Sequence, residues 1–164
     1  MKMLYAMATA TALLLTSMMA HANDPKAAIA KLDERLAKIG PARVDGTDKV
    51  GGKAVGALFF GARKINNNYD VVDEIKKSTG ASATVFVKDG DDFVRVSTNV
   101  LTPEGKRGVG TTLAHAKAYE AVAKGESFCG VVDVLGTELD SCYYPVKDAA
   151  GKVIGVTYVG FKKS

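Results

Sequence analysis

Hydrophobic residues recur at helical spacing in three segments of the chain. These segments are 24–39, 66–78 and 111–123. Side chains three and four positions apart share one face of a helix, so each segment is predicted to be an amphipathic helix that buries one side. Asp24 and Pro25 suit the first turn of the first helix, and Gly80 follows the second helix at a position where helices commonly end.

Strand-forming residues dominate the other regular segments. Strands are predicted over 54–60, 83–87 and 93–101, and three more within 127–162. Turn residues at 88–91, Leu135-Gly136 and 148–151 separate neighbouring strands, and tight turns join antiparallel strands. Residues 41–53 are rich in glycine and charge and are predicted to be a loop. The whole pattern predicts an α+β fold, with helices covering an antiparallel sheet of about five strands.

The first 22 residues have the pattern of a cleaved secretory signal peptide. Met1-Lys2 is a short basic start, residues 4–19 are apolar or small, and Ala20-His21-Ala22 fits a cleavage site, so the mature chain is expected to begin at Asn23. The alternative is an uncleaved membrane anchor, but the apolar stretch is shorter than the roughly 20 residues that a spanning helix needs. The sequence therefore predicts a periplasmic or secreted protein with one domain over 23–164.

Charge and residue counts disfavour several function classes. Without Lys2 the chain carries 21 basic and 18 acidic residues, a small excess that is spread along the sequence and gives no nucleic-acid-binding patch. His115 is the one histidine after the signal peptide, which is too few for a histidine-rich metal site. The glycine-rich stretch 105–110 fits neither common phosphate-binding motif. No enzyme activity, metal or cofactor is expected.

The two cysteines are predicted to face each other across a hairpin. If Leu135-Gly136 is a two-residue turn, Cys129 lies directly opposite Cys142. Opposed residues have Cβ atoms roughly 4.5–5.5 Å apart, close to the separation that a disulfide requires, and an oxidising compartment favours the bond. The alternative is a pair of separate, small buried residues.

The same register predicts which side chains share a face of the sheet. Three residues of the first hairpin strand, Phe128, Gly130 and Val132, are expected opposite Tyr143, Ser141 and Leu139. Alternation places Phe93, Arg95 and Ser97 together on their own strand. A buried arginine requires an acceptor, since an unpaired guanidinium costs several kcal/mol. The acceptor for Arg95 is either a structural carboxylate or the carboxylate of a ligand.

Seven short motifs follow one another in the order seen in a known family. They are VVDEI (71–75), ATVFV (83–87), DFVRVSTNV (92–100), GVGT (108–111), KGESF (124–128), YYPVKD (143–148) and GKVIGVTYVG (151–160). In this order the chain resembles the Cache 3/Cache 2 fusion type of sensor domain from about Val50 to Phe161. Such domains usually form the extracytoplasmic part of methyl-accepting chemotaxis receptors and sensor kinases.

The resemblance implies a PAS-like single Cache domain with a long N-terminal helix and a pocket for a small metabolite, often a short carboxylate. Carried over by motif, the ligand-binding candidates are Arg95, Phe93, Ser97, Phe128, Leu139, Ser141 and Tyr143. The family usually has tyrosine where Phe128 and Leu139 stand, and small residues other than cysteine at the two cysteine positions. The loss of two hydroxyls means that the family's ligand cannot be carried over, and it leaves open a more apolar ligand, or none.

The resemblance also shapes the expected partners. No membrane-spanning segment follows Gly160 in this sequence, so a free-standing binder is expected, which presents its state to a separate membrane chemoreceptor or sensor kinase. One alternative is a structural or interaction protein that has lost its pocket. A redox role for Cys129 and Cys142 is less favoured, because they do not form a C-x-x-C motif. Homodimerisation is left open.

Overall fold

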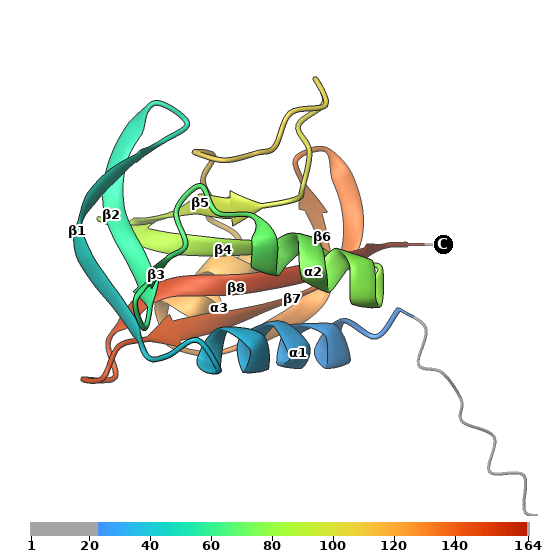
Figure 1. The fold of residues 1–164 in the computed structure, drawn as a ribbon. Coiled ribbons are helices and arrows are strands. Elements are labelled where there is room, and N and C mark those ends of the chain that lie inside the picture. The colour runs from blue at the N-terminus through green and yellow to red at the C-terminus, as the bar shows by residue number, and fades with distance from the viewer. Residues whose placement is uncertain (1–22, 164) are drawn as a thin grey trace, which may run out of the picture.

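An antiparallel sheet of five strands forms the centre of the molecule (Figure 1). The structure is a computed structural model that describes residues 23–163, so the signal peptide expected over 1–22 lies outside the described residues. The helices are α1 (Pro25–Ala37), α2 (Asp70–Thr79) and α3 (Lys117–Ala123). The strands are β1 (Ala42–Val50), β2 (Lys53–Phe60), β3 (Arg63–Lys64), β4 (Ser82–Asp89), β5 (Asp92–Thr98), β6 (Phe128–Val134), β7 (Thr137–Lys147) and β8 (Val153–Lys162).

The central sheet has the strand order β5-β4-β8-β7-β6, with antiparallel pairing throughout. Three of its four pairings join strands that are consecutive in the chain or linked by a short turn. The fourth joins β4 to β8, which lie more than sixty residues apart in the sequence. The expected α+β fold and a sheet of about five strands are therefore confirmed.

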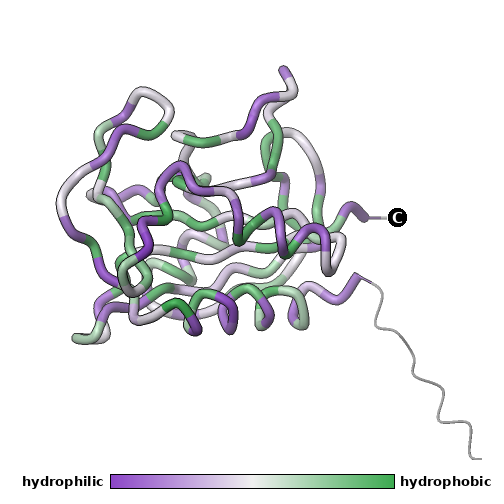
Figure 2. The backbone as a smooth tube through the Cα atoms, in the orientation of Figure 1, coloured by the Kyte–Doolittle hydropathy of each residue, from purple (hydrophilic) through white to green (hydrophobic). Residues whose placement is uncertain are grey.

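Helices α1 and α2 cover one face of this sheet, and α3 lies behind the opposite face (Figure 1). The α1 side chains Ile29 and Leu32 are fully buried against strand residues such as Val85 and Val159. In Figure 2, hydrophobic and hydrophilic stretches alternate along α1 and α2, as the sequence pattern requires of helices with one buried side. Helix α1 has 13 residues, so the long N-terminal helix implied by the resemblance is not confirmed.

The prediction of a loop over 41–53 is wrong, because these residues form β1 and the turn into β2. Together with β3 they make a second, three-stranded antiparallel sheet. Most β1 side chains are exposed, so the strand lacks the alternation of hydrophobic and polar residues that usually reveals one. Backbone pairing with β2 holds it in place, and the Arg43 guanidinium lies 4.4 Å from the centre of the Phe59 ring.

Two of the predicted helices begin later than the sequence pattern indicates. Helix α2 starts at Asp70 instead of residue 66, because the Asn66 side chain accepts a hydrogen bond from Leu58 N and donates one to Gly56 O. Helix α3 starts at Lys117 instead of residue 111. Residues 111–113 lie along the free edge of β5, where backbone pairing replaces the helical bonds.

Within residues 23–163, no helix is both long enough and apolar enough to cross a membrane.

Candidate functional site

The hairpin of β6 and β7 has the register that the sequence predicts. Leu135 and Gly136 both have positive φ, as the central residues of a tight hairpin turn often do. Cys129 lies opposite Cys142, their Cα atoms are 4.1 Å apart, and a disulfide joins them. The predicted disulfide is therefore present. Because Cys142 is fully buried and its bond to Cys129 closes the hairpin, the bond fixes the strands that carry several candidate residues.

Most of the candidate residues gather on the sheet face that α3 covers. Phe93, Leu139 and Tyr143 belong to one buried cluster on this face, and Phe128 packs against it while partly exposed. Ser141 is fully buried and lies opposite Gly130 in the hairpin. Its hydroxyl donates to the Leu139 carbonyl oxygen at 3.1 Å, so in this structure it bonds to its own strand.

A row of side chains crosses this face, of which the sequence reasoning found only the pair Phe128 and Tyr143. The register places four residues side by side across β4, β8, β7 and β6: Thr84, Tyr158, Tyr143 and Phe128. The rings of Tyr143 and Tyr158 are 4.8 Å apart, and those of Phe128 and Tyr143 are 6.5 Å apart. No local turn sets the register between β4 and β8, so the sequence alone could not place Tyr158 in this row.

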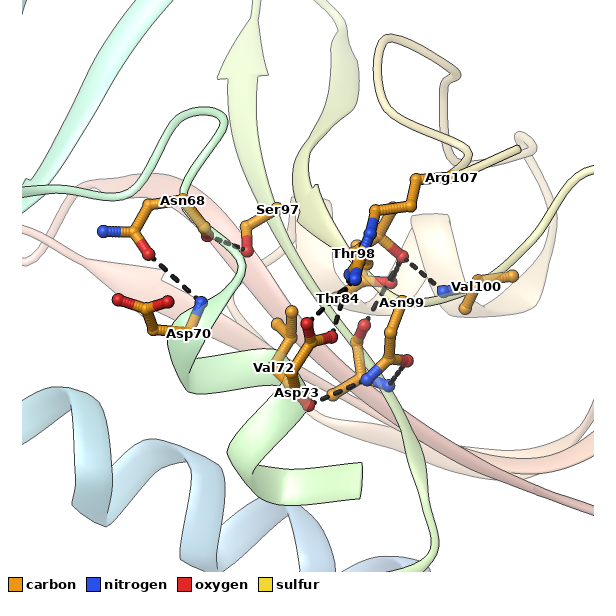
Figure 3. A network of polar contacts seen from close by, with 11 residues as sticks. Asn68, Asp70, Val72, Asp73, Thr84, Ser97, Thr98, Asn99, Val100 and Arg107 are labelled. Atoms are coloured by element: carbon orange, nitrogen blue, oxygen red, sulfur yellow. Dashed lines mark hydrogen bonds and ion pairs between the residues drawn. The ribbon is translucent and has the colours of Figure 1, made fainter. Parts of the chain in front are cut away.

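Ser97 does not share this face with Arg95, and the prediction that it does is wrong. Between Val85 and Phe86 the pairing of β4 with β5 shifts by one residue, so that Val96 is an extra residue on β5. Such a bulge reverses the alternation of side chains beyond it. The Ser97 hydroxyl therefore points toward α2, where it donates to the Asn68 carbonyl oxygen at 2.6 Å (Figure 3).

Arg95 is the charged residue of the candidate face and is 3% exposed. Its Nη1 donates to Thr111 Oγ1 at 3.0 Å and to the Thr112 carbonyl oxygen at 2.9 Å. The guanidinium also lies 4.9 Å from the centre of the Phe86 ring. Its buried Nε has no hydrogen-bond partner, and no carboxylate of residues 23–163 forms a salt bridge with it. Burial consequently lowers the pKa of Arg95.

Two tyrosine hydroxyls share the electrostatic environment of Arg95. Burial raises the pKa of both Tyr143 and Tyr158, and the nearby Arg95 charge acts in the opposite direction. Both phenols are therefore neutral at physiological pH. The buried Tyr158 Oη has no partner that satisfies hydrogen-bond geometry, although the Ser141 hydroxyl lies close enough to lower the Tyr158 pKa. The face thus contains an unpaired N–H on Arg95 and a Tyr158 hydroxyl with no well-formed hydrogen bond.

The position of the Tyr158 hydroxyl depends on the absence of a side chain at residue 160. A Cβ added to Gly160 would overlap Tyr158 Oη and would lie 2.9 Å from Cζ of the same ring. We expect Gly160→Ala to push the ring out of its place and to lower the free energy of unfolding by about 1–3 kcal/mol, the usual cost of overpacking. Urea unfolding measures this loss. Gly136→Ala would not serve as a control, because Gly136 has a positive φ. Tyr158→Phe in the Gly160→Ala background removes the overlapping oxygen and should recover part of the loss, whereas no recovery would contradict the steric explanation.

The glycine-rich stretch 105–110 covers the edge of β5 next to Arg95. Gly110 N donates to the Arg95 carbonyl oxygen at 2.8 Å, and Arg95 N donates to the Thr111 carbonyl oxygen at 2.9 Å. Gly110 has φ 82° and lies against Gly51 in the turn between β1 and β2, where a Cβ on Gly110 would come within 2.8 Å of Gly51 Cα. This close approach explains Gly110 without a phosphate ligand.

A polar network ties the same stretch to α2 on the other side of the sheet (Figure 3). Arg107 forms two 2.8 Å hydrogen bonds with the two carboxylate oxygens of Asp73, and its guanidinium lies 4.4 Å from the centre of the Tyr69 ring. Asn99 donates to the Val72 carbonyl oxygen at 2.7 Å. The segment over Arg95 is therefore anchored at both faces of the domain.

Metal ligands are not grouped in the described part of the chain. Within residues 23–163, no three His, Cys, Asp or Glu side chains are close enough together to hold an ion. His115, just before α3, forms a 2.8 Å hydrogen bond with Asp92 and stacks on Tyr119, with 3.9 Å between the ring centres. This pair lies at the surface.

An α+β fold with an antiparallel five-stranded sheet, α1 and α2 on one face and α3 on the other, is consistent with a PAS-like domain. The sequence agrees: residues 9–164 match the Cache 3/Cache 2 fusion domain, and the chain belongs to this family. Cache domains are extracellular domains that sense small molecules by binding them and do not catalyse reactions. No curated protein sequence matches the chain.

Proposed function

We propose that this domain binds a small carboxylate through Arg95 on the α3 side of the sheet. One observation carries the proposal: a guanidinium that is 3% exposed has no carboxylate partner among residues 23–163. A buried arginine without a counter-charge is costly, and a bound carboxylate would relieve that cost through a bidentate pair. The ligand takes the place that a structural carboxylate occupies in an ordinary buried ion pair.

The surroundings of Arg95 support a ligand with one acidic group and an apolar part. Tyr158 Oη and Arg95 Nε are unpaired and offer hydrogen bonds to a carboxylate. Phe93, Leu139 and Phe128 provide apolar contacts. Ser141 and Tyr143 complete the proposed set, whereas Ser97 is left out because its hydroxyl bonds to Asn68 on the other face.

The ligand reaches Arg95 by displacing the segment that now covers it. Both hydrogen bonds from Nη1 go to residues of this segment, Thr111 and Thr112. A carboxylate is a stronger acceptor for a guanidinium than a hydroxyl or a carbonyl oxygen, so exchange of partners favours the bound state. Opening and closing of the segment is then the conformational change that a partner protein senses.

Arg95 variants test the proposal in a thermal-shift screen of small carboxylates. A ligand at about a hundred times its dissociation constant stabilises the fold by about 2.7 kcal/mol and raises the melting temperature by several degrees. We expect Arg95→Gln to abolish the shift and Arg95→Lys to reduce it, because lysine keeps the charge but loses the planar fork. Arg43→Gln, at an arginine that is paired with Asp45 on β1, is the matched control and should leave the shift unchanged.

Two outcomes would count against carboxylate binding. One is a carboxylate panel that causes no shift in the wild-type protein. The other is an equal shift in the folded Arg95→Gln variant. Circular dichroism establishes whether each variant is folded, and Arg95→Lys keeps the experiment informative if Arg95→Gln is not.

A second candidate function is a structural or interaction domain on the same scaffold. It is favoured by one observation, that Thr111 and Thr112 already occupy the Nη1 donors of Arg95. In this case the covering segment is permanent, and Arg95→Gln lowers the free energy of unfolding without any ligand being involved. A melting temperature that no compound changes, together with binding to a protein partner, would distinguish this function from sensing.

We also propose export by the signal peptide, with cleavage after Ala22, and a membrane chemoreceptor or sensor kinase as the partner. The apolar stretch and the Ala20-His21-Ala22 pattern support export. The disulfide between Cys129 and Cys142 is compatible with an oxidising compartment. The mass of the protein purified from its native cells would show whether the chain begins at Asn23, and crosslinking in those cells would test the receptor partner.

A further inference from the structure

A groove of about 230 Å³ lies on the sheet face opposite Arg95, between α1 and the end of the sheet. Helix α1 runs beside β7 and β8 at this place (Figure 1). The groove walls are largely apolar and include Leu36, Pro41, Phe60, Pro145 and Val146. Its volume is below the roughly 300–1,000 Å³ of sites for drug-sized ligands, so it suits a smaller compound.

One carboxyl group, that of Asp33 on α1, lines this apolar groove. Asp33 Oδ1 accepts a 2.7 Å hydrogen bond from Thr157 Oγ1 on β8, which fixes the orientation of the side chain. Within residues 23–163, no lysine, arginine or histidine forms a salt bridge with Asp33. The negative charge therefore lies against hydrocarbon with a single neutral hydrogen bond, an arrangement that a cation would stabilise.

The other charged residue of the groove does not supply that cation. Lys147 lines the groove, but its Nζ lies near Gly125, which connects α3 to β6 on the other side of the sheet: a Cβ on Gly125 would be 3.5 Å from this atom. The remaining lining residues from β1, β2 and the turn after α1 are uncharged. The charged residues nearest to Asp33 along α1 are engaged elsewhere: Glu34 pairs with Lys38, the residue after the helix, at 2.7 Å, and Arg35 pairs with Glu74 at 3.0 Å. Lys31 lines a different surface groove, together with these four residues.

We propose that this groove is a binding site for a small alkylammonium compound, whose ammonium group pairs with Asp33 and whose alkyl chain lies along the apolar wall. The ammonium donates to the carboxylate oxygen that does not bond to Thr157, so the existing hydrogen bond is kept. The ligand contacts α1 and the sheet at once and strengthens the attachment of this helix. This site is distinct from Arg95 in place and in the charge of its ligand, and it does not depend on the function proposed above.

Protonation of Asp33 competes with such a ligand. Burial raises the pKa of Asp33 to about 6. An alkylammonium group stays protonated throughout the range from pH 5 to 7.5, because its pKa is near that of lysine, about 10.4. Binding is therefore expected to weaken about tenfold from pH 7.5 to pH 5, as Asp33 becomes about one-tenth ionised.

Nuclear magnetic resonance titration with n-butylammonium tests the site. In the wild-type protein at pH 7.5, we expect saturable shifts of the backbone amides of Ala37, Val146 and Thr157. Asp33→Asn should raise the dissociation constant at least tenfold, whereas Glu34→Gln should change it less than twofold. Glu34→Gln is a matched control, because it removes the same charge from the next residue of the same helix, at an exposed position.

Two further ligands separate charge recognition from apolar contact. n-Butanol has the same alkyl chain without the charge, and n-butyrate has the opposite charge, so both should bind at least tenfold more weakly than n-butylammonium. The proposal is overturned if n-butylammonium leaves the groove amides unmoved. It is equally overturned if the groove binds n-butanol as well as n-butylammonium, or if Asp33→Asn binds as the wild-type protein does. The amide spectrum itself shows that each variant is folded.

Discussion

Loss of the disulfide is expected to lower the free energy of unfolding by about 3 kcal/mol, the typical effect for a bond that closes a loop of roughly 15 residues. Cys129 and Cys142 are 13 residues apart in the sequence, and the bond restricts the unfolded chain over that distance. Urea unfolding of the Cys129→Ala/Cys142→Ala double variant measures the loss. Alanine is preferred to serine because Cys142 is fully buried, where a hydroxyl would need a partner.

A reducing agent provides the control for this prediction. The wild-type protein should lose about the same stability when it is reduced, as expected from the cost of removing a native disulfide. The double variant should unfold at the same urea concentration with and without the reducing agent. Two free thiols in the denatured, unreduced wild-type protein would contradict the bond itself.

Asp33→Asn is expected to stabilise the domain near pH 7. Burial of Asp33 raises the pKa of its carboxyl from 3.8 to about 6, so the folded protein binds this proton more tightly than the unfolded chain. The stabilisation of the fold by the tighter binding of this proton is therefore complete below about pH 4. It falls as the pH rises from about 4 to 6 and is lost above pH 6. An asparagine accepts the same hydrogen bond from Thr157 without becoming charged. The gain at pH 7 is about 2–3 kcal/mol, from 1.36 kcal/mol for each pKa unit.

The difference between two unfolding curves isolates this effect from other titrating groups. Urea unfolding of the wild-type protein and of Asp33→Asn at several values between pH 4 and 7 should give free energies that converge near pH 4 and diverge toward pH 7. Glu34→Gln, which changes an exposed carboxyl on the same helix, should follow the wild-type slope between pH 5 and 7. Parallel curves for the wild-type protein and Asp33→Asn would show that the Asp33 pKa is not raised.

The parts of the fold that depend on local turns could be predicted from the sequence. Leu135-Gly136 is a two-residue turn, and a turn of this length leaves one register for its strands. The pairs of Phe128 with Tyr143 and of Cys129 with Cys142 follow directly, and both are confirmed. Helix α1 could be predicted for the same reason, since its apolar spacing and its Asp24 cap are local features.

Other parts of the site depend on contacts that no local pattern reveals. Val96, the extra residue on β5, is hydrophobic and β-branched like an ordinary strand residue, so nothing in its identity predicts the shift that turns Ser97 away from Arg95. Strand β1 is mostly exposed and is held by β2 instead of by a hydrophobic face. Residues 111–113 are expected to belong to a helix but pair with β5, because tertiary backbone pairing outweighs a weak helix preference.

The position of β8 in the middle of the sheet has a consequence for the order of folding. β8 covers Val153–Lys162 and follows every other strand of residues 23–163 in the sequence, yet it separates β4 from β7. During synthesis, β4 and β5 can form their hairpin early, as can β6 and β7, but the two hairpins remain unconnected until residue 162 has left the ribosome. Closure over such a long sequence separation is slow compared with the formation of either hairpin. The five-stranded sheet therefore remains incomplete until β8 has been synthesised, whichever hairpin forms first.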